Sequence, residues 1–134
     1  MKGHCLCGAV TVSMPERLDY HACHCGICRR WGGGPAFAMH SATAPQVEGG
    51  AQVRAYRSSE WAERAFCANC GTHLWYRLLP GDEYTVSVGL FGDETPFRMG
   101  EQIFIDRKPA GYAFANETPC LTEAEVFAKY APPD

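Results

Sequence analysis

Seven of the eight cysteines in this chain of 134 residues fall into short clusters, and their spacing points to metal chemistry. Within each cluster one or two residues separate the cysteines, at Cys5, Cys7, Cys23, Cys25, Cys28, Cys67 and Cys70. Cysteines this close are poorly placed for a structural disulfide with each other, since a disulfide joins Cα atoms ~5.5 Å apart with a fixed dihedral angle. They are well placed to bind one metal ion from a tight turn, so we expect metal binding.

Two of the clusters together supply four thiolates. Cys5 and Cys7 combine with Cys67 and Cys70 to predict a closed tetrahedral site, which is typical of structural zinc. A glycine follows each pair and suits a turn that requires a positive φ. The alternative for the CxxC pair is a redox motif, but the surrounding sequence lacks a βαβ pattern. The zinc site would tie the N-terminal residues to the middle of the chain.

The remaining cluster supplies three thiolates, from Cys23, Cys25 and Cys28. Three protein ligands and a vacant position are typical of a zinc site open to water or substrate, so we expect a catalytic role here. Two alternatives stay open: a fourth ligand from His24 or His21 would make the site structural, or the thiols bind no metal. His24 is not expected to bind together with both flanking cysteines, because adjacent side chains of a strand point to opposite faces.

The elements that position these clusters are predicted to be mostly strands. Alternation and β-branched residues favour strands over residues 9–14, 20–22, 36–40, 52–56, 73–78, 84–88 and 101–105, and residues 63–66 lead into the second CxxC pair. A glycine-rich loop is expected over 29–35 and a hairpin break over 80–82. One helix is expected over 123–130, where Thr122 and Glu125 form a capping box, and Cys120 before it is expected to pack as a small apolar side chain. We therefore predict one mostly antiparallel β domain over residues 1–134, clipped by metal.

Composition restricts the class of partner. Hydrophobic residues make up 46% of the chain, as in an ordinary globular protein. A net charge of −3 and a pI near 5.9 disfavour nucleic-acid binding, since such domains usually have a pI above ~9. No stretch approaches the ~20 apolar residues of a membrane helix. The N-terminal residues lead directly into patterned sequence without a signal peptide, so we expect a cytoplasmic protein with reduced thiols.

The clusters lie within longer motifs that follow one another in a specific order. These motifs are Gly3-x-Cys5-x-Cys7-Gly8-Ala9-Val10, Cys23-His24-Cys25-x-x-Cys28-Arg29, Tyr56-Arg57-Ser58-Ser59, and Arg64-x-Phe66-Cys67-x-x-Cys70-Gly71-Thr72-x-Leu74. Together with the glycine-rich segment they run from residue 3 to about residue 77. In this combination the chain resembles the glutathione-dependent formaldehyde-activating (GFA) family, which also includes centromere protein V.

The resemblance implies a zinc-stabilised β-tent, a mainly β fold of antiparallel sheets with little helix. It implies two zinc ions per chain, a structural one at Cys5, Cys7, Cys67 and Cys70 and a second, catalytic-type one at Cys23, Cys25 and Cys28. The implied activity is that of a carbon–sulfur lyase, S-(hydroxymethyl)glutathione synthase, which joins glutathione to formaldehyde. The implied partner is a small thiol such as glutathione, and neither a nucleic acid nor a membrane. The oligomeric state is not predicted.

Glutathione carries two carboxylates, so arginines are candidate substrate-binding residues, because a guanidinium binds a carboxylate in a bidentate fork. The candidates are Arg29, Arg30, Arg57 and Arg64, of which the first two adjoin the three-cysteine cluster. Each of them could instead be a solvated side chain or a structural ion pair.

A different class of function is a zinc-stabilised binding module, in which both clusters are structural and no chemistry takes place. A fourth protein ligand on the three-cysteine cluster would favour that alternative. A methionine sulfoxide reductase, which shares the tent, is disfavoured because the chain lacks an Arg-x-Cys-x-Asn motif.

Overall fold

The computed structural model describes residues 1–130 and is mainly β, with eleven strands and two short α-helices in this part of the chain. The expected fold class, mainly β with little helix, is confirmed. The backbone divides into two compact units. The first contains Met1–Leu18 and Ala38–Pro96, and the second contains Asp19–Phe37 and the described residues from Phe97 to Tyr130. The single domain expected over residues 1–134 stays a prediction.

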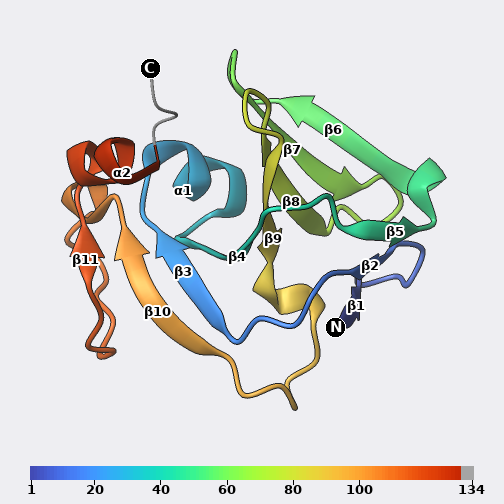
Figure 1. The fold of residues 1–134 in the computed structure, drawn as a ribbon, viewed down its shortest axis with the longest axis horizontal. Coiled ribbons are helices and arrows are strands. Elements are labelled where there is room, and N and C mark those ends of the chain that lie inside the picture. Colours follow the sequence, from blue (N-terminus) through green and yellow to red (C-terminus); the bar gives the residue numbers. More distant parts are fainter. Residues whose placement is uncertain (131–134) are drawn as a thin grey trace. The chain divides into compact units, whose positions relative to one another are not determined.

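The strands of the first unit pair in antiparallel fashion (Figure 1). One group has the order β1-β2-β5 and contains β1 (Lys2–His4), β2 (Thr11–Ser13) and β5 (Gln46–Glu48). The other has the order β4-β9-β8-β7-β6 and contains β4 (Ala36–Ser41), β9 (Glu83–Ser87), β8 (His73–Leu78), β7 (Ala62–Cys67) and β6 (Val53–Arg57). Short 3-10 helices at Gly50–Gln52 and Val88–Leu90 precede β6 and follow β9.

Alternation of side chains builds the core of the first unit. In β9 the buried residues are Tyr84 and Val86, two positions apart, and the residues between and beside them are more exposed. Val12 of β2, Met39 of β4 and Leu74 of β8 are fully buried. This pattern is expected where one face of an antiparallel sheet packs on a core.

The second unit contains three strands that run in one direction. Its strand order is β11-β10-β3, with β3 (Asp19–Cys23), β10 (Arg98–Ile103) and β11 (Cys120–Leu121). Two helices belong to it, α1 (Gly26–Gly32) and α2 (Glu123–Tyr130), and a short 3-10 helix covers Ile105–Arg107. The expectation of mostly antiparallel strands is confirmed by the pairings of the first unit, and the second unit adds parallel pairs that the sequence did not predict. Parallel strands need long connections, and residues 104–119 form one between β10 and β11.

The segment expected to be a glycine-rich loop contains α1 instead. Cys25 caps this helix, since its side chain accepts the backbone N–H of Cys28. Gly33 ends it with φ 87° and donates its N–H to the carbonyl of Arg29. Residues 29–32 are therefore helical, and only Gly33, Gly34 and Pro35 of the expected loop lie in irregular backbone.

Residues close together in the sequence determine where α2 begins. Thr122 and Glu125 exchange two hydrogen bonds, from Thr122 N–H to Glu125 Oε1 at 3.1 Å and from Glu125 N–H to Thr122 Oγ1 at 3.2 Å. The predicted capping box is confirmed. Cys120 contradicts its expectation, because its side chain on β11 is exposed rather than packed in the core. No helix in residues 1–130 has the length and apolar character needed to cross a membrane.

Gly49 is predicted to be essential to the packing of the first unit. It has φ 79°, and a Cβ atom there would lie 1.9 Å from the carbonyl oxygen of Ala9. We expect Gly49→Ala to lower the free energy of unfolding by about 2–4 kcal/mol, from left-handed strain together with the backbone clash. Urea denaturation checks this. The neighbouring Gly50→Ala is the matched control, because its Cβ meets nothing within 4 Å. Equal losses for the two variants would contradict the prediction.

Candidate metal centres

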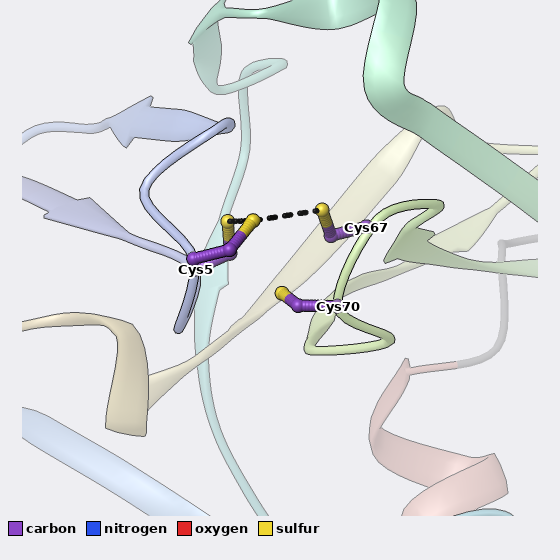
Figure 2. Close-up of side chains that lie close together, drawn as sticks. Cys5, Cys67 and Cys70 are labelled. Atoms are coloured by element: carbon purple, nitrogen blue, oxygen red, sulfur yellow. Dashed lines mark hydrogen bonds between the residues drawn. The ribbon is translucent and has the colours of Figure 1, made fainter.

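The first candidate centre contains the four cysteines that the sequence assigned to a closed site. The sulfurs of Cys5, Cys7, Cys67 and Cys70 lie within 4.8 Å of one another, although 60 residues separate Cys7 from Cys67. Figure 2 shows the labelled side chains of Cys5, Cys67 and Cys70 turned toward a common centre. Cys5 and Cys67 are completely buried, Cys70 is half-buried and Cys7 is exposed.

Two similar turns hold these pairs. The N–H of Gly8 donates to the carbonyl of Cys5 at 3.0 Å, and the N–H of Gly71 donates to the carbonyl of Cys67 at 2.7 Å. Both glycines have a positive φ, 80° and 79°, which confirms the turn expected after each pair.

The spacing of the sulfurs fits a bound ion. Cys7 Sγ lies 3.6 Å from Cys5 Sγ and 3.8 Å from Cys67 Sγ. A tetrahedral ion at the zinc–thiolate distance of ~2.3 Å separates its sulfur ligands by ~3.8 Å. The four thiols therefore could hold one metal ion with little rearrangement.

Hydrogen bonds lower the pKa of two of these thiols. The Thr72 side chain and backbone lower the pKa of Cys70 to about 5, with help from the Cys7 backbone. Burial acts to raise the pKa of Cys5, but the hydrogen bond from the Val10 backbone and those of neighbouring thiols leave it lowered. Metal ligation requires thiolates, so the lowered pKa values favour binding of a cation.

The Cys67 thiol behaves differently. The Cys70 backbone N–H acts to lower the pKa of Cys67, but burial and the neighbouring thiols leave it raised. Because all four sulfurs are close together, deprotonation of one thiol disfavours deprotonation of the next. A bound cation would offset that repulsion.

The second candidate centre lies where β3 meets α1. Cys23 ends β3, Cys25 caps α1 and Cys28 lies in its first turn, and their sulfurs lie within 4.8 Å of one another. Cys23 and Cys28 are buried and Cys25 is half-buried. Contacts with the Cys25 and Cys28 thiols, followed by burial, raise the pKa of Cys23. Three crowded thiols in a buried position could hold a cation, since a cation would stabilise their charged form.

His24 lies between two of these cysteines in the sequence, but its ring forms hydrogen bonds with residues outside the cluster. Its ring is fully buried, with Nε2 2.9 Å from Gln102 Oε1 and Nδ1 2.8 Å from the Tyr112 hydroxyl. Gln102 donates from Nε2 to Thr118 Oγ1 at 3.2 Å, which leaves Oε1 as the acceptor for His24. In the neutral ring, Nε2 donates to Gln102 and Nδ1 accepts from Tyr112. Both ring nitrogens are therefore occupied by hydrogen bonds.

The surroundings of Tyr112 suit its role as a donor. Burial raises the pKa of Tyr112, while the charge of Arg29 acts to lower it and the charge of Cys23 to raise it. The Tyr112 hydroxyl therefore stays protonated and can donate a hydrogen bond to His24 Nδ1. Among residues 1–130, no histidine, aspartate or glutamate joins the three thiols in a metal-holding group. A fourth ligand from His24 or His21, the alternative left open by the sequence, is not observed in that range.

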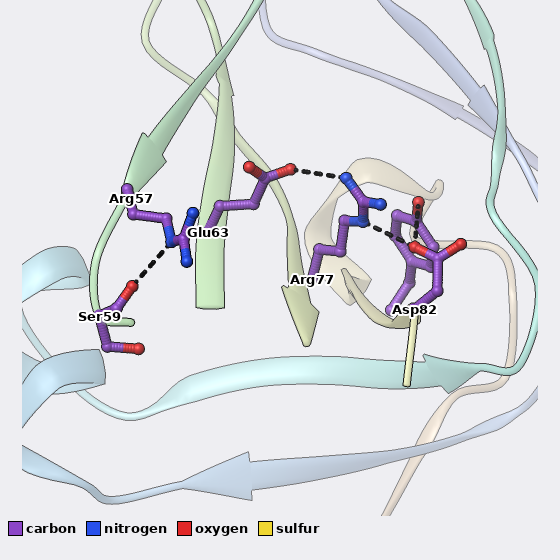
Figure 3. A network of polar contacts seen from close by, with 6 residues as sticks. Arg57, Ser59, Glu63, Arg77 and Asp82 are labelled. Carbon is purple, nitrogen blue, oxygen red and sulfur yellow. Dashed lines mark hydrogen bonds and ion pairs between the residues drawn. The ribbon is translucent and has the colours of Figure 1, made fainter. Parts of the chain in front are cut away.

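The four candidate arginines fall into the two units. Arg29 and Arg30 lie in α1, next to the second centre, and Arg29 Nε donates to the carbonyl of His24 at 3.0 Å. Arg57 and Arg64 belong to the first unit, where Arg57 donates to the carbonyl of Ser59 (Figure 3) and to that of Glu60.

Arg64 is buried, with Nε 3.3 Å from Ser58 Oγ and its guanidinium over the Tyr76 ring. The contacts of Arg57 and Arg64 thus organise the β6–β7 hairpin. Arg77 on β8 binds Glu63 on β7 at 3.2 Å and Asp82, which lies between β8 and β9, at 2.7 Å (Figure 3).

Sequence reasoning missed the polar partners of both centres. Tyr112 and Gln102 lie 88 and 78 residues from His24, and no spacing signal connects them with it. Thr72 follows Cys70 by two residues, and a hydroxyl this close to a ligand was the available signal.

Comparison with known proteins places the chain in a family. Residues 1–107 match the family model described as glutathione-dependent formaldehyde-activating enzyme. The chain is 37% identical over 127 residues to an uncharacterized lyase of Schizosaccharomyces pombe, covering 93% of each protein. It is 32% identical over 85 residues to a putative glutathione-dependent formaldehyde-activating enzyme of Halomonas elongata, covering 56% of this chain and 54% of that protein.

The fold also matches a solved structure. A crystal structure of a Rhodobacter sphaeroides protein superposes with a TM-score of 0.59 and 29% sequence identity, over 72% of this chain and 92% of that chain. The family match extends over both cysteine clusters. The chain therefore belongs to the glutathione-dependent formaldehyde-activating enzyme family.

Proposed function

We propose that this protein is a zinc-dependent enzyme of the carbon–sulfur lyase type, similar to S-(hydroxymethyl)glutathione synthase. A thiol such as glutathione would bind at the centre formed by Cys23, Cys25 and Cys28 and add to formaldehyde or a related small electrophile. The family supports an enzyme of this kind, and the names of the relatives include a lyase. The observation that carries the proposal is the engagement of both His24 ring nitrogens, which leaves three protein ligands at this centre.

The ligand count determines what chemistry the centre would favour. A zinc ion bound there would supply a free coordination position and favour the thiolate form of an incoming thiol. Three thiolates outweigh the charge of such an ion, so the centre would polarise a carbonyl weakly and hold sulfur well. Cys25 is the half-buried member of the set, and the incoming sulfur would enter on its side.

The addition itself balances without an oxidant or a reductant. The thiol sulfur forms a bond to the aldehyde carbon, the carbonyl oxygen takes up a proton, and the proton of the thiol is released. Arg29 and Arg30 would bind the carboxylates of glutathione, because both lie in the helix that carries Cys28. Arg29 is already oriented by its bond to the His24 carbonyl.

Metal content and stability should separate the two centres. We expect two zinc ions per chain by elemental analysis, with the loss of one in Cys25→Ser and little change in the circular dichroism spectrum. Cys70→Ser should lose the other ion and melt at a markedly lower temperature, since a closed zinc site contributes directly to the free energy of folding. Unfolding of both variants to the same extent would contradict separate roles for the centres.

Glutathione should change the coordination of the second centre. X-ray absorption of the zinc-loaded protein should show additional zinc–sulfur coordination when glutathione is added. S-methylglutathione, which lacks a free thiol, should produce no change and serves as the matched ligand. Product formation from glutathione and formaldehyde should exceed the uncatalysed rate in the same buffer. Unchanged coordination together with product at the uncatalysed rate would overturn the proposed function.

Arg30 should contribute to recognition of the substrate carboxylates. We expect Arg30→Gln to raise the KM for glutathione about tenfold, the effect of losing one charge-assisted hydrogen bond. The KM for 2-mercaptoethanol, which has no carboxylate, should stay the same. Arg98→Gln is the control, because Arg98 is an exposed arginine of the same unit that binds Asp19. A similar rise in KM for both thiols would exclude carboxylate binding by Arg30.

A further inference from the structure

The four sulfurs of the first centre receive hydrogen bonds unequally. Cys70 Sγ lies 3.1 Å from Thr72 Oγ1, and the backbone N–H groups of Thr72 and Cys7 also donate to it. Cys5 Sγ accepts the N–H of Val10 at 3.3 Å. Three of these donors are backbone groups, so the fold itself sets the pattern.

The other two sulfurs differ from each other. Cys67 accepts the backbone N–H groups of Asn69 and Cys70. The side-chain contacts of Cys7 within residues 1–130 are with the sulfurs of Cys5, Cys67 and Cys70. If the four cysteines bind one ion as thiolates, none of these sulfurs carries a proton, so the contacts between sulfurs supply no hydrogen-bond donor to Cys7. Cys7 is therefore the thiolate of this set that its surroundings stabilise least.

Solvent access also distinguishes Cys7 from the other three cysteines. Cys5 and Cys67 are fully buried and Cys70 is half-buried, whereas Cys7 is exposed. Leu6 beside it is 86% exposed, so the turn that carries Cys7 projects into solvent. A reagent in solution would reach Cys7 more readily than the other three sulfurs.

The direction of the Thr72 hydrogen bonds explains the protection of Cys70. Leu6 N–H donates to Thr72 Oγ1 at 3.1 Å, so the oxygen acts as an acceptor toward Leu6. The single hydroxyl proton is then available to the Cys70 thiolate, which can only accept. A hydrogen bond to a thiolate stabilises its charge and reduces its nucleophilicity.

We propose that Cys7 is the modification site of this centre, the thiolate at which soft carbon electrophiles such as α,β-unsaturated carbonyl compounds attack. The Cys7 sulfur forms a bond to the β-carbon, the electron pair of the C=C bond moves to give an enolate, and water supplies the proton. The product sulfur is a neutral thioether, which binds metal more weakly than a thiolate. Modification of Cys7 thus removes one anionic ligand from the centre that joins the two turns. This inference is independent of the proposed function.

The experiment maps alkylation of the zinc-loaded full chain by substoichiometric N-ethylmaleimide. The chain carries Cys120→Ser, because Cys120 is an exposed thiol outside both clusters and would consume reagent. Peptide mass spectrometry should show Cys7 modified at least about ten times faster than Cys5, Cys67 or Cys70, since both access and hydrogen bonding favour it. The melting temperature should fall in proportion to the Cys7 adduct.

Variants at Thr72 test the role of hydrogen bonding while they keep all four ligands. Thr72→Val removes the hydroxyl proton with nearly the same shape and should raise the alkylation rate of Cys70 several-fold, whereas Thr72→Ser should keep the native rate. Alkylation of Cys70 at a rate equal to that of Cys7 in the otherwise native chain would overturn the proposal. An adduct on Cys7 that leaves the melting temperature unchanged would overturn the claim that modification weakens the centre.

Discussion

The first unit depends on the convergence of four thiols from two turns far apart in the chain. Its first strands contain three residues each, and strands this short are not stable alone. A bond between residues 5–7 and 67–70 lowers the entropy of the unfolded chain, because it closes a loop of about 60 residues. The Leu6 N–H already donates to Thr72 Oγ1 across this closure. A metal ion would therefore join turns that the polypeptide has brought together.

The two cysteine clusters offer four and three candidate ligands, and a polar network in the second unit occupies the histidine next to the smaller cluster. His24 stands between two candidate ligand cysteines, so the sequence offers a possible fourth ligand next to them. The fold assigns its ring to Gln102 and Tyr112 instead. Turning the ring toward the thiols would leave a buried Gln102 oxygen without its donor, at a cost of about 1–3 kcal/mol. The three-ligand count thus follows from a satisfied network as well as from the number of cysteines.

Much of the fold and of the candidate centres could be predicted from the sequence, because these features depend on residues that are close together in the chain. The division of the cysteines follows from spacing within turns, and the capping box at Thr122 and the hairpin around 80–82 depend on neighbouring residues. The helix at Gly26–Gly32 was missed because its glycines favour a loop, while the capping role of Cys25 and the left-handed Gly33 appear only with coordinates. The parallel pairing of β10 with β3 and β11, and the exposure of Cys120 on β11, depend on contacts between distant segments. The partners of His24 could not be predicted for the same reason.

Both centres offset negative charge with backbone N–H groups that donate to sulfur, since Cys25 accepts the N–H of Cys28, but only the second has arginines on its own helix. Four thiolates around one divalent ion leave a surplus of negative charge, and the first centre offsets it with N–H groups and the Thr72 hydroxyl that donate directly to sulfur. A fourth thiolate at the second centre would create the same surplus there, and α1 carries Arg29 and Arg30 in its last turn. A nearby cation favours binding of an anion without placing a proton on its sulfur. A thiolate held in this way keeps more of its nucleophilicity than one that accepts hydrogen bonds directly, and the addition proposed above would need such a thiolate.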